Sequence, residues 1–581
     1  MDYPVWFLPG IGGGFFIALI AIVHVFVSHF AVGGGLYLVW TERKGLRENN
    51  LRILEFTRRH TGFFMLLTMV FGGITGVGIW FIISLVNPAA TSKLIHLFVY
   101  GWAAEWVWFL VEIIALLVYY YTFGRMDSTR HQIVGWIYAA AAWLSLFLIN
   151  GIIDFMLTPG QWLENGRFWS GFFNPTFWPA LFFRSFFAFM LAGLYGFVNS
   201  VRIADAETRR TMARYNGKWS LGFLALLLPS AWWYLQALPQ PARELVLGAS
   251  PTIRAAIPWA IAGLAGVISL TVLLTLARPT SKSLPLALAT LIPAFFMMGS
   301  FEWTREAARR PFVINQYMYS TGVTLARAEA LKGQSYLANT RFASVRQVKD
   351  DNLSVAGAEL FKFQCYACHT IGGLNNDILQ RTSAMDYKGM VNYLLKVMHK
   401  RPYMPPFLGT EKEAQALAAY LIGDLQGKPV DLASLETTTS PGQELYEENC
   451  VGCHGLDIIR DWTRGQSVDE VVVGLGSLSE LNESMENFAG SIEQKRQLAL
   501  FLKGGGAGGL QAKAVLEENC TGCHGLETIR EWSSSLSKKK ILEGIGRLGA
   551  LNPMMEGISL EPDQLQSVAE WLKTSAKGGA K

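Results

Sequence analysis

Long apolar stretches in the first 301 residues constrain the fold of this chain more than any other feature. Each is long enough for the roughly 20 residues that an α-helix needs to cross the hydrocarbon core of a bilayer. They lie near 13–40, 61–86, 95–123, 132–157, 173–201, 217–238, 257–277 and 283–301. The sequence therefore predicts a mainly α protein that begins with an eight-helix transmembrane bundle of two four-helix units in a lipid bilayer.

Basic residues indicate which loops face the cytoplasm. Arg and Lys gather in the loop at 42–60 and again in the loop at 202–218. The positive-inside rule makes both loops cytoplasmic, so the N-terminus and everything after the eighth span lie outside. Residues 1–14 have no basic start and no cleavage site, and we expect the first helix to be kept. The predicted location is a bacterial inner membrane, multi-pass, with both ends of the chain in the periplasm.

All six cysteines belong to three copies of one pattern, Cys-x-x-Cys-His. In this pattern two thiols bond covalently to haem and the histidine supplies an axial nitrogen. Zinc would need four ligands where each copy supplies three, and a thioredoxin-like pair does not need the histidine. We predict three covalent haem c groups, on the periplasmic side where such attachment occurs. The residues are Cys365, Cys368 and His369; Cys450, Cys453 and His454; and Cys520, Cys523 and His524.

A thioether is the usual second axial ligand of such a haem. The first copy offers Met404, in an arrangement that resembles class I cytochrome c, with His399 as a rival. The second and third copies repeat at an offset of 70 residues, which maps Met485 onto Met555, whose neighbour Met554 breaks the register. Core packing is the alternative role for each methionine.

The expected domains follow from these motifs and from the linkers between them. Thr- and Gly-rich stretches at 436–441 and 504–509 separate the motifs. We expect three small all-α cytochrome c domains after the bundle. The predicted boundaries are 1–310 for the transmembrane domain, 311–350 for a linker, and 351–430, 431–506 and 507–581 for the cytochrome c domains.

Ionisable side chains within the spans are functional candidates, since burying them in a bilayer is unfavourable. His24, Glu105 and Arg184 are expected at one depth, about 16 Å from the outer surface. Glu112 lies seven residues after Glu105, so both carboxyl groups face one side of a helix, which suits a proton path. The alternative is a plain anchor with Glu105 and Arg184 as a salt bridge, although an anchor needs only one helix. His29 is expected to point away from His24.

Residues 13–315 resemble subunit I of the cytochrome bd quinol oxidases. The similarity is carried by segments 18–24 and 105–112, by Asn150-Gly151 and Asn174-Pro175, and by Glu306-Ala-Ala-Arg309-Arg310-Pro311-Phe312. It implies one or two non-covalent membrane haems, of b or d type, and a second membrane subunit. It also implies that His24 ligates a high-spin membrane haem and Glu306 a second one, and that Glu105 and Glu112 carry protons. Arg309 is a further candidate catalytic residue.

The chain departs from that family where quinol donates electrons. The segment 181–185 has no histidine and the seventh span has no methionine, so both low-spin haem ligands are missing. The quinol loop shrinks to 239–256 and the ninth helix is absent. The resemblance therefore implies that quinol entry is lost while the oxygen site is partly kept.

Three functions remain open from the sequence. The first passes electrons from a periplasmic cytochrome or other redox protein through the c haems to a membrane haem that reduces oxygen. The second oxidises quinol and releases electrons through the c haems, with a quinone as partner. The third is a haem-free membrane scaffold that carries an electron wire in a respiratory complex. The net charge of +5 gives no indication of a nucleic-acid partner.

Overall fold

The computed structural model describes most of the chain up to residue 432 and parts of the chain beyond it. The described residues are 3–373, 375–383, 385–400, 403–432, 442, 445–446, 449–450, 456–481, 485, 487–503, 512, 515–517, 519–520, 525–547, 560, 565, 568–569 and 571–573.

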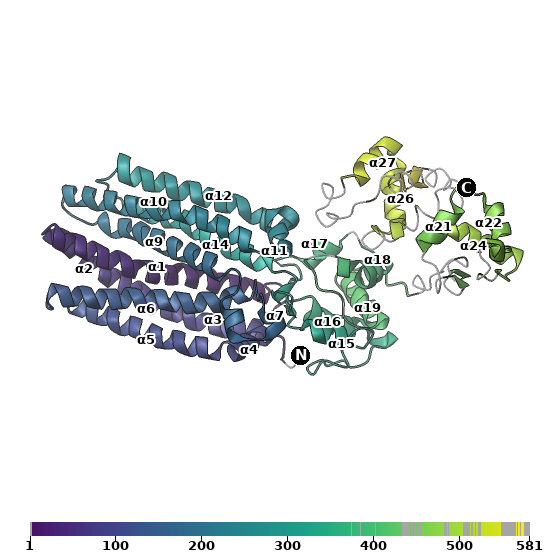
Figure 1. Ribbon diagram of the computed structural model, residues 1–581, viewed down its shortest axis with the longest axis horizontal. Helices are drawn as coiled ribbons and strands as arrows, with labels where there is room; N and C mark the ends of the chain where they lie inside the picture. The colour runs from purple at the N-terminus through teal and green to yellow at the C-terminus, as the bar shows by residue number, and fades with distance from the viewer. Residues whose placement is uncertain are drawn as a thin grey trace.

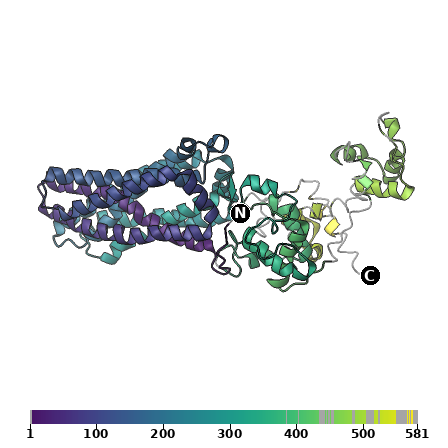
Figure 2. The ribbon, with the colours of Figure 1, turned by 90° about the horizontal axis from the view of Figure 1, so that it is seen from below.

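The first part of the chain is a bundle of long helices that lie side by side (Figures 1 and 2). In chain order the elements are α1 (Gly13–Arg47), α2 (Leu51–Met65), η1 (Leu66–Gly72), α3 (Gly73–Val86), α4 (Pro88–Leu97), α5 (Val99–Tyr121), α6 (Ser128–Phe155), α7 (Trp162–Asn165), α8 (Phe168–Phe172), α9 (Phe177–Ser200), α10 (Ala206–Ala237), α11 (Gln240–Glu244), η2 (Leu245–Ala249), α12 (Pro251–Val272), η3 (Leu273–Ala277), α13 (Leu284–Ala289) and α14 (Leu291–Ala308).

The bundle has two groups of helices. One group contains α1, the continuous α2–η1–α3 segment, α5 and α6, and the other contains α9, α10, α12 and α14. Helix α1 joins them, since it packs against α6 in its own group and against α9 in the other. Close approach requires glycine here: a Cβ on Gly33 would lie 1.9 Å from the carbonyl oxygen of Ala188. A mainly helical fold is confirmed.

Among the described residues, seven helices are long and apolar enough to cross a membrane, so the chain is a multi-pass membrane protein. The expected sixth span, 217–238, lies in α10 and is not among these seven. Its apolar part is short because the first half of α10 carries basic residues and the second half contains Pro229 and Trp residues. Helix α10 is nevertheless 32 residues long and packs along α9 within the bundle.

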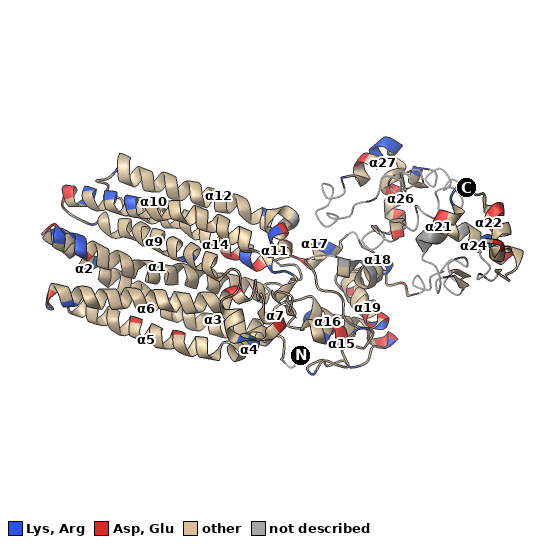
Figure 3. Cartoon of the chain, viewed as in Figure 1, with Lys and Arg blue, Asp and Glu red and all other residues tan. Residues whose placement is uncertain are grey.

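The expected cytoplasmic loops are shorter than the sequence indicated. Helix α1 continues to Arg47, and Asn50 caps α2 by accepting from the backbone amides of Arg52 and Ile53. Asp205 likewise caps α10. Lys and Arg gather on α2 and α10 at the end of the bundle away from the second half of the chain (Figure 3). Both basic clusters therefore lie at the same end of the bundle.

The second part of the chain is helical, with one two-stranded antiparallel sheet. Its elements are β1 (Phe312–Ile314), β2 (Met318–Tyr319), α15 (Leu325–Ala330), η4 (Asp350–Asn352), α16 (Leu353–Gln364), α17 (Ile378–Thr382), α18 (Tyr387–Asn392), η5 (Tyr393–Val397), η6 (Met398–Lys400), α19 (Glu411–Ala418), η7 (Ala419–Asp424), α21 (Leu456–Thr463), α22 (Val468–Leu475), α23 (Leu478–Leu481), α24 (Ile492–Leu502), α26 (Leu526–Ser534) and α27 (Lys538–Ile545).

Residues 311–350, expected as a linker, are folded onto the first cytochrome domain. Val323, Leu331 and Leu337 belong to the same buried core as Leu360 of α16. The Glu413 carboxylate on α19 fixes this segment, because it accepts hydrogen bonds from the backbone amides of Tyr336 at 2.9 Å and Leu337 at 2.8 Å. This segment is folded because its apolar side chains are buried in the core that contains Leu360 of α16.

The 70-residue repeat also appears in the described helices. Helix α21 begins at Leu456 and α26 at Leu526, while α22 spans Val468–Leu475 and α27 spans Lys538–Ile545. The two cores correspond as well, with Val471 and Leu475 in one and Ile541 and Ile545 in the other. In both views α26 and α27 lie nearer to the first cytochrome domain than α22 and α24 do.

Candidate haem sites

The first Cys-x-x-Cys-His motif follows directly from the end of α16. The turn is closed by two hydrogen bonds of 3.0 Å, from the amides of Cys368 and His369 to the carbonyl oxygen of Cys365. His369 Nδ1 donates to the carbonyl oxygen of Asn376 at 3.0 Å. The lone pair of His369 therefore lies on Nε2, the arrangement of a histidine that binds a metal. Burial lowers the pKa of His369 to about 4, which keeps the ring neutral.

Met404 is the better placed of the two candidate second ligands in this domain. It is half-buried and packs against the core that also contacts Cys365, and its sulfur accepts from the Tyr393 hydroxyl at 3.9 Å. The loop that carries it is fixed where the Gln364 side chain bonds both the carbonyl and the amide of Leu408. His399, in contrast, is exposed. The residues present fit a covalent haem with a histidine and a methionine ligand.

The second and third motifs lie mostly outside the described residues. Cys450 and Cys520 each pack against the core of their own helices, and Met485 is half-buried. The remaining predicted ligands are outside the part of the chain that the structure describes: Cys453, His454, Cys523, His524 and Met555. Their roles stay predictions.

The first cytochrome domain is seated on the end of the bundle opposite the basic clusters of α2 and α10. Arg310, just after α14, contacts the sulfur of Cys368. The segment before α1 runs over the same domain, where the Leu8 amide donates to the Tyr366 hydroxyl at 2.8 Å and the Ile371 amide donates to the Pro9 carbonyl at 2.8 Å. Cys368, a predicted haem-binding residue, therefore lies directly beside the end of a membrane helix.

His24 has the geometry of a ligand inside the bundle. The Thr75 hydroxyl donates to the Phe71 carbonyl at 2.8 Å, so His24 Nδ1 must donate to the Thr75 oxygen, 3.0 Å away. The lone pair is then on Nε2. The π-helical segment η1 precedes Thr75, and such segments often mark functional sites. A Cβ on Gly76 would lie 3.1 Å from the His24 ring, so a glycine leaves room for it.

Two further buried histidines were not assigned a role from the sequence. His29 Nδ1 donates to the Val25 carbonyl at 2.7 Å, and its Nε2 has no partner among the described residues. The Asn199 amide donates to His60 Nδ1 at 2.8 Å, which places the His60 proton on Nε2. His29 thus has the lone pair of a metal ligand and His60 does not.

Glu105 and Glu112 face α6 and contact hydroxyl groups. Glu105 accepts from Ser145 at 2.7 Å, and Glu112 accepts from Tyr138 at 3.2 Å. The Glu105–Arg184 salt bridge considered as an alternative does not form. Arg184 instead pairs with Glu302 of α14 at 3.0 Å.

The partner of Arg184 was missed from the sequence. Glu302 lies between Arg184 and Arg305, which it contacts at 3.0 and 2.9 Å. The signal was present, because Glu302, Arg305, Glu306 and Arg309 recur at helical spacing. It was overlooked because α14 continues to Ala308 and does not end near residue 301, so these residues lie on the helix itself.

Glu306 and Arg309 lie together in the last turn of α14 and at its C-cap. The Glu306 carboxylate contacts Arg309 and, at 3.5 Å, Arg310. Through Arg310 this cluster adjoins Cys368. The roles of Glu306 as a haem ligand and of Arg309 beside it stay predictions.

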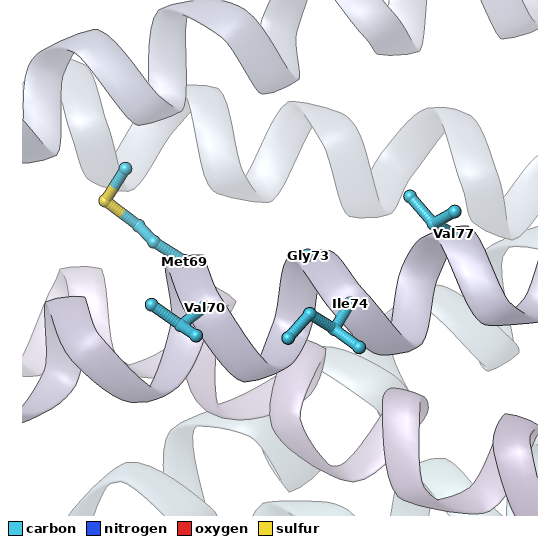
Figure 4. Close-up of a pocket in the computed structure, with 5 residues that line it drawn as sticks. All are labelled: Met69, Val70, Gly73, Ile74 and Val77. Atoms are coloured by element: carbon cyan, nitrogen blue, oxygen red, sulfur yellow. The ribbon is translucent and has the colours of Figure 1, made fainter.

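An open hollow on the surface of the bundle is lined by apolar residues. It lies on η1 and α3 and is lined by Met69, Val70, Gly73, Ile74 and Val77 (Figure 4). Three of these side chains are more than half exposed. This face is suited to lipid or to an apolar partner and not to redox chemistry.

Comparison with known proteins identifies part of the second half. Among solved structures, the chain is similar to the bd oxidase from Geobacillus thermodenitrificans, at 17% identity and a TM-score of 0.45, covering 52% of this chain and 86% of that one. No curated protein matches the sequence. Residues 354–421 match the family model for cytochrome c oxidase, cbb3-type, subunit III. This region is a cytochrome c-type domain, the kind of domain that carries haem c.

Proposed function

We propose that this protein takes electrons from a periplasmic redox protein, passes them through three c haems, and delivers them to a membrane haem site that reduces a small acceptor such as oxygen. One observation carries the proposal: the cysteine turn of the first cytochrome domain rests on the outer end of α14, where Arg310 contacts Cys368. Electron transfer between cofactors needs short distances, and a haem bound at this turn would lie next to the end of a membrane helix.

The residues around His24 support a haem inside the bundle. Its Nε2 lone pair is set by the bond from Nδ1 to Thr75, as in histidines that ligate metals. A membrane haem bound there would supply the iron at which a small acceptor is reduced. Glu105 and Glu112 would then hold the protons that the reduction consumes.

A second membrane subunit belongs to the same proposal. The outer face of η1 and α3 is apolar and largely exposed, and it includes the hollow of Figure 4. Such an apolar face can be covered by a transmembrane partner or by lipid. Co-purification of the complex in mild detergent distinguishes the two.

The haem content of the purified protein tests the function. Pyridine haemochrome spectra measure covalent haem, and acidic solvent extraction measures non-covalent haem, for the wild type and for His24→Ala. His96→Ala is the matched control, since His96 lies exposed near the end of α4. We expect three covalent haems per chain in all three proteins, and extractable haem that is lost only in His24→Ala.

Absence of extractable haem from an intact complex would contradict the proposal and leave a scaffold that carries an electron wire. Where the haem is present, oxygen consumption is compared with reduced cytochrome c and with a soluble quinol as donors. Consumption driven by reduced cytochrome c supports the proposed direction. Reduction of the c haems by quinol, with no oxygen uptake, would establish the reverse direction.

A further inference from the structure

Helices α5 and α6 share a ladder of polar side chains with a regular spacing. Each helix carries three of them, seven residues apart, and seven residues are nearly two helical turns, so each set forms one stripe. The facing pairs are Glu105 with Ser145, Glu112 with Tyr138, and Tyr119 with His131. The ladder therefore runs from the middle of the bundle to the end away from the cytochrome domains.

The last pair of the ladder is joined by a third helix. Glu42 of α1 accepts from the Tyr119 hydroxyl at 2.7 Å and from His131 Nδ1 at 2.6 Å, and it also contacts Gln132. The other ring nitrogen, His131 Nε2, lies 2.8 Å from the Tyr119 carbonyl oxygen. A carbonyl oxygen and an ionised carboxylate both accept, so with Glu42 ionised both ring nitrogens of His131 carry a proton.

This cluster is buried although it lies close to the end of the bundle. Glu42 is 3% exposed and His131 is 2% exposed. Helix α5 ends at Tyr121 and α6 begins at Ser128, so His131 is within the first turn of its helix. The Phe123 ring packs on His131 at 4.8 Å and covers it. Phe123, which lies in the short connection between α5 and α6, thus helps to shield the His131 ring from solvent.

We infer that the cluster of Glu42, Tyr119 and His131 is a proton entry site, which feeds Glu112 and Glu105 from the end of the bundle opposite the cytochrome domains. This rests on the proposed function, which needs protons at the membrane haem. Each proton that leaves the cluster towards Glu112 is replaced from the water at the basic end of the bundle. Each one consumed beyond Glu105 balances one electron from the c haems.

The contacts of Glu112 and Glu105, in the middle of the ladder, allow these carboxyl groups to transfer a proton. Glu112 and Glu105 contact hydroxyl groups, and no ion pair involves either carboxyl within the described residues. A carboxyl group without a cation in an apolar bundle is held in its neutral, protonated form. The Tyr138 hydroxyl lies 3.2 Å from Glu112 and 3.0 Å from the Ala31 carbonyl, so it can rotate between two acceptors. Successive pairs are about 10 Å apart along the helices, a gap for one or two bridging waters.

The test follows deuterium into the carboxyl groups of Glu105 and Glu112, which are half-buried. The full-length protein is diluted into D2O, and the shift of the carboxyl C=O infrared band is timed, with Glu112→Gln and Glu105→Gln used to assign the band. We expect Glu42→Gln and Tyr138→Phe each to slow this exchange at least about tenfold, since a positioned proton donor commonly accelerates transfer by more than that. Tyr37→Phe is the control, because it removes an equally buried hydroxyl that bonds Asn216 of α10, off the ladder.

A second readout separates this inference from the proposed function. In vesicles with the cytochrome domains outside, an internal pH dye records proton uptake from the lumen when the c haems are reduced from outside. Exchange in Glu42→Gln and Tyr138→Phe at the rate of Tyr37→Phe would overturn the inference even where the membrane haem is present and active. If these variants slow exchange but the protein contains no membrane haem, the proton entry site is supported and the proposed oxidase function is contradicted. Tyr138→Phe keeps its ring packing, so a folding failure of Glu42→Gln does not leave the ladder untested.

Discussion

The two sides of the bundle hold carboxyl groups in opposite ways. Between α9 and α14, Glu302 is held by two guanidinium groups, those of Arg184 and Arg305. Between α5 and α6, Glu105 and Glu112 contact only hydroxyl groups among the described residues. The first arrangement neutralises a fixed charge in place, whereas the second leaves a carboxyl group free to gain and lose a proton. Burial of a carboxyl group alone therefore does not indicate its role, and its contacts do.

The largest effect is expected where a buried charge loses its partner. Glu302→Gln leaves Arg184, which is 1% exposed, without its counter-ion and should destabilise the protein by about 3–5 kcal/mol. Thermal unfolding in detergent, followed by helical circular dichroism, measures this. The double variant Arg184→Met with Glu302→Leu should recover part of the loss. If it is as unstable as the single variant, the pair is not a coupled unit.

A smaller effect is expected at the charged end of the ladder. Tyr119→Phe removes a hydrogen bond to the buried Glu42 carboxylate, and bonds to charged groups contribute about 1.5–3 kcal/mol. The His131 and Gln132 contacts to the same carboxylate remain. The same unfolding assay should show a loss in this range. A loss as large as that of Glu302→Gln would remove the contrast between the two sides.

A neutral hydrogen bond of the ladder should contribute less. Ser145→Ala removes the donor to Glu105, and such a bond contributes about 0.5–1.5 kcal/mol. Because serine and alanine are nearly equal in size, packing should be unaffected. Thr68→Ala is a suitable control, since its hydroxyl bonds only its own helix at the Phe64 carbonyl. Equal losses in the two variants would show that Glu105 does not depend on Ser145.

The smallest effect on stability is expected at Glu112. In Glu112→Gln the amide oxygen still accepts from the Tyr138 hydroxyl, so the free energy of unfolding should change by less than about 1 kcal/mol. Proton delivery to the membrane site should nevertheless fail, because an amide cannot carry the proton. A stability loss like that of Glu302→Gln would mean that Glu112 is a buried charge and not a proton carrier.

Much of the fold was predictable from local sequence properties. The length and hydropathy of the stretches predicted seven of the membrane helices, because each helix satisfies its own backbone hydrogen bonds in the bilayer. The helical cytochrome c domain at 354–421 follows from its cysteine turn. Helix ends were predicted less well: α1 and α14 extend past the apolar stretch, since charged residues continue a helix once their side chains find partners.

The candidate sites were predicted in part. The sequence singled out His24, Glu105, Glu112 and Arg184, and the structure places each within the bundle with a polar partner. It did not indicate Glu42 or His131, because both lie close to the ends of the apolar stretches and resemble ordinary loop residues. Only the packing of α6 against both α1 and α5 brings them together.

The sequence by itself determined that the first half crosses a membrane, and it predicted where covalent haem attaches. Both follow from local chemistry: two thiols and a histidine within five residues bind one haem, and an apolar stretch of sufficient length partitions into lipid. Tertiary structure decided which buried charges meet. Arg184 could pair with any carboxylate at its depth, and it pairs with Glu302, 118 residues away, because α9 and α14 pack together. Long-range pairing depends on which helix faces touch, and no local pattern records that.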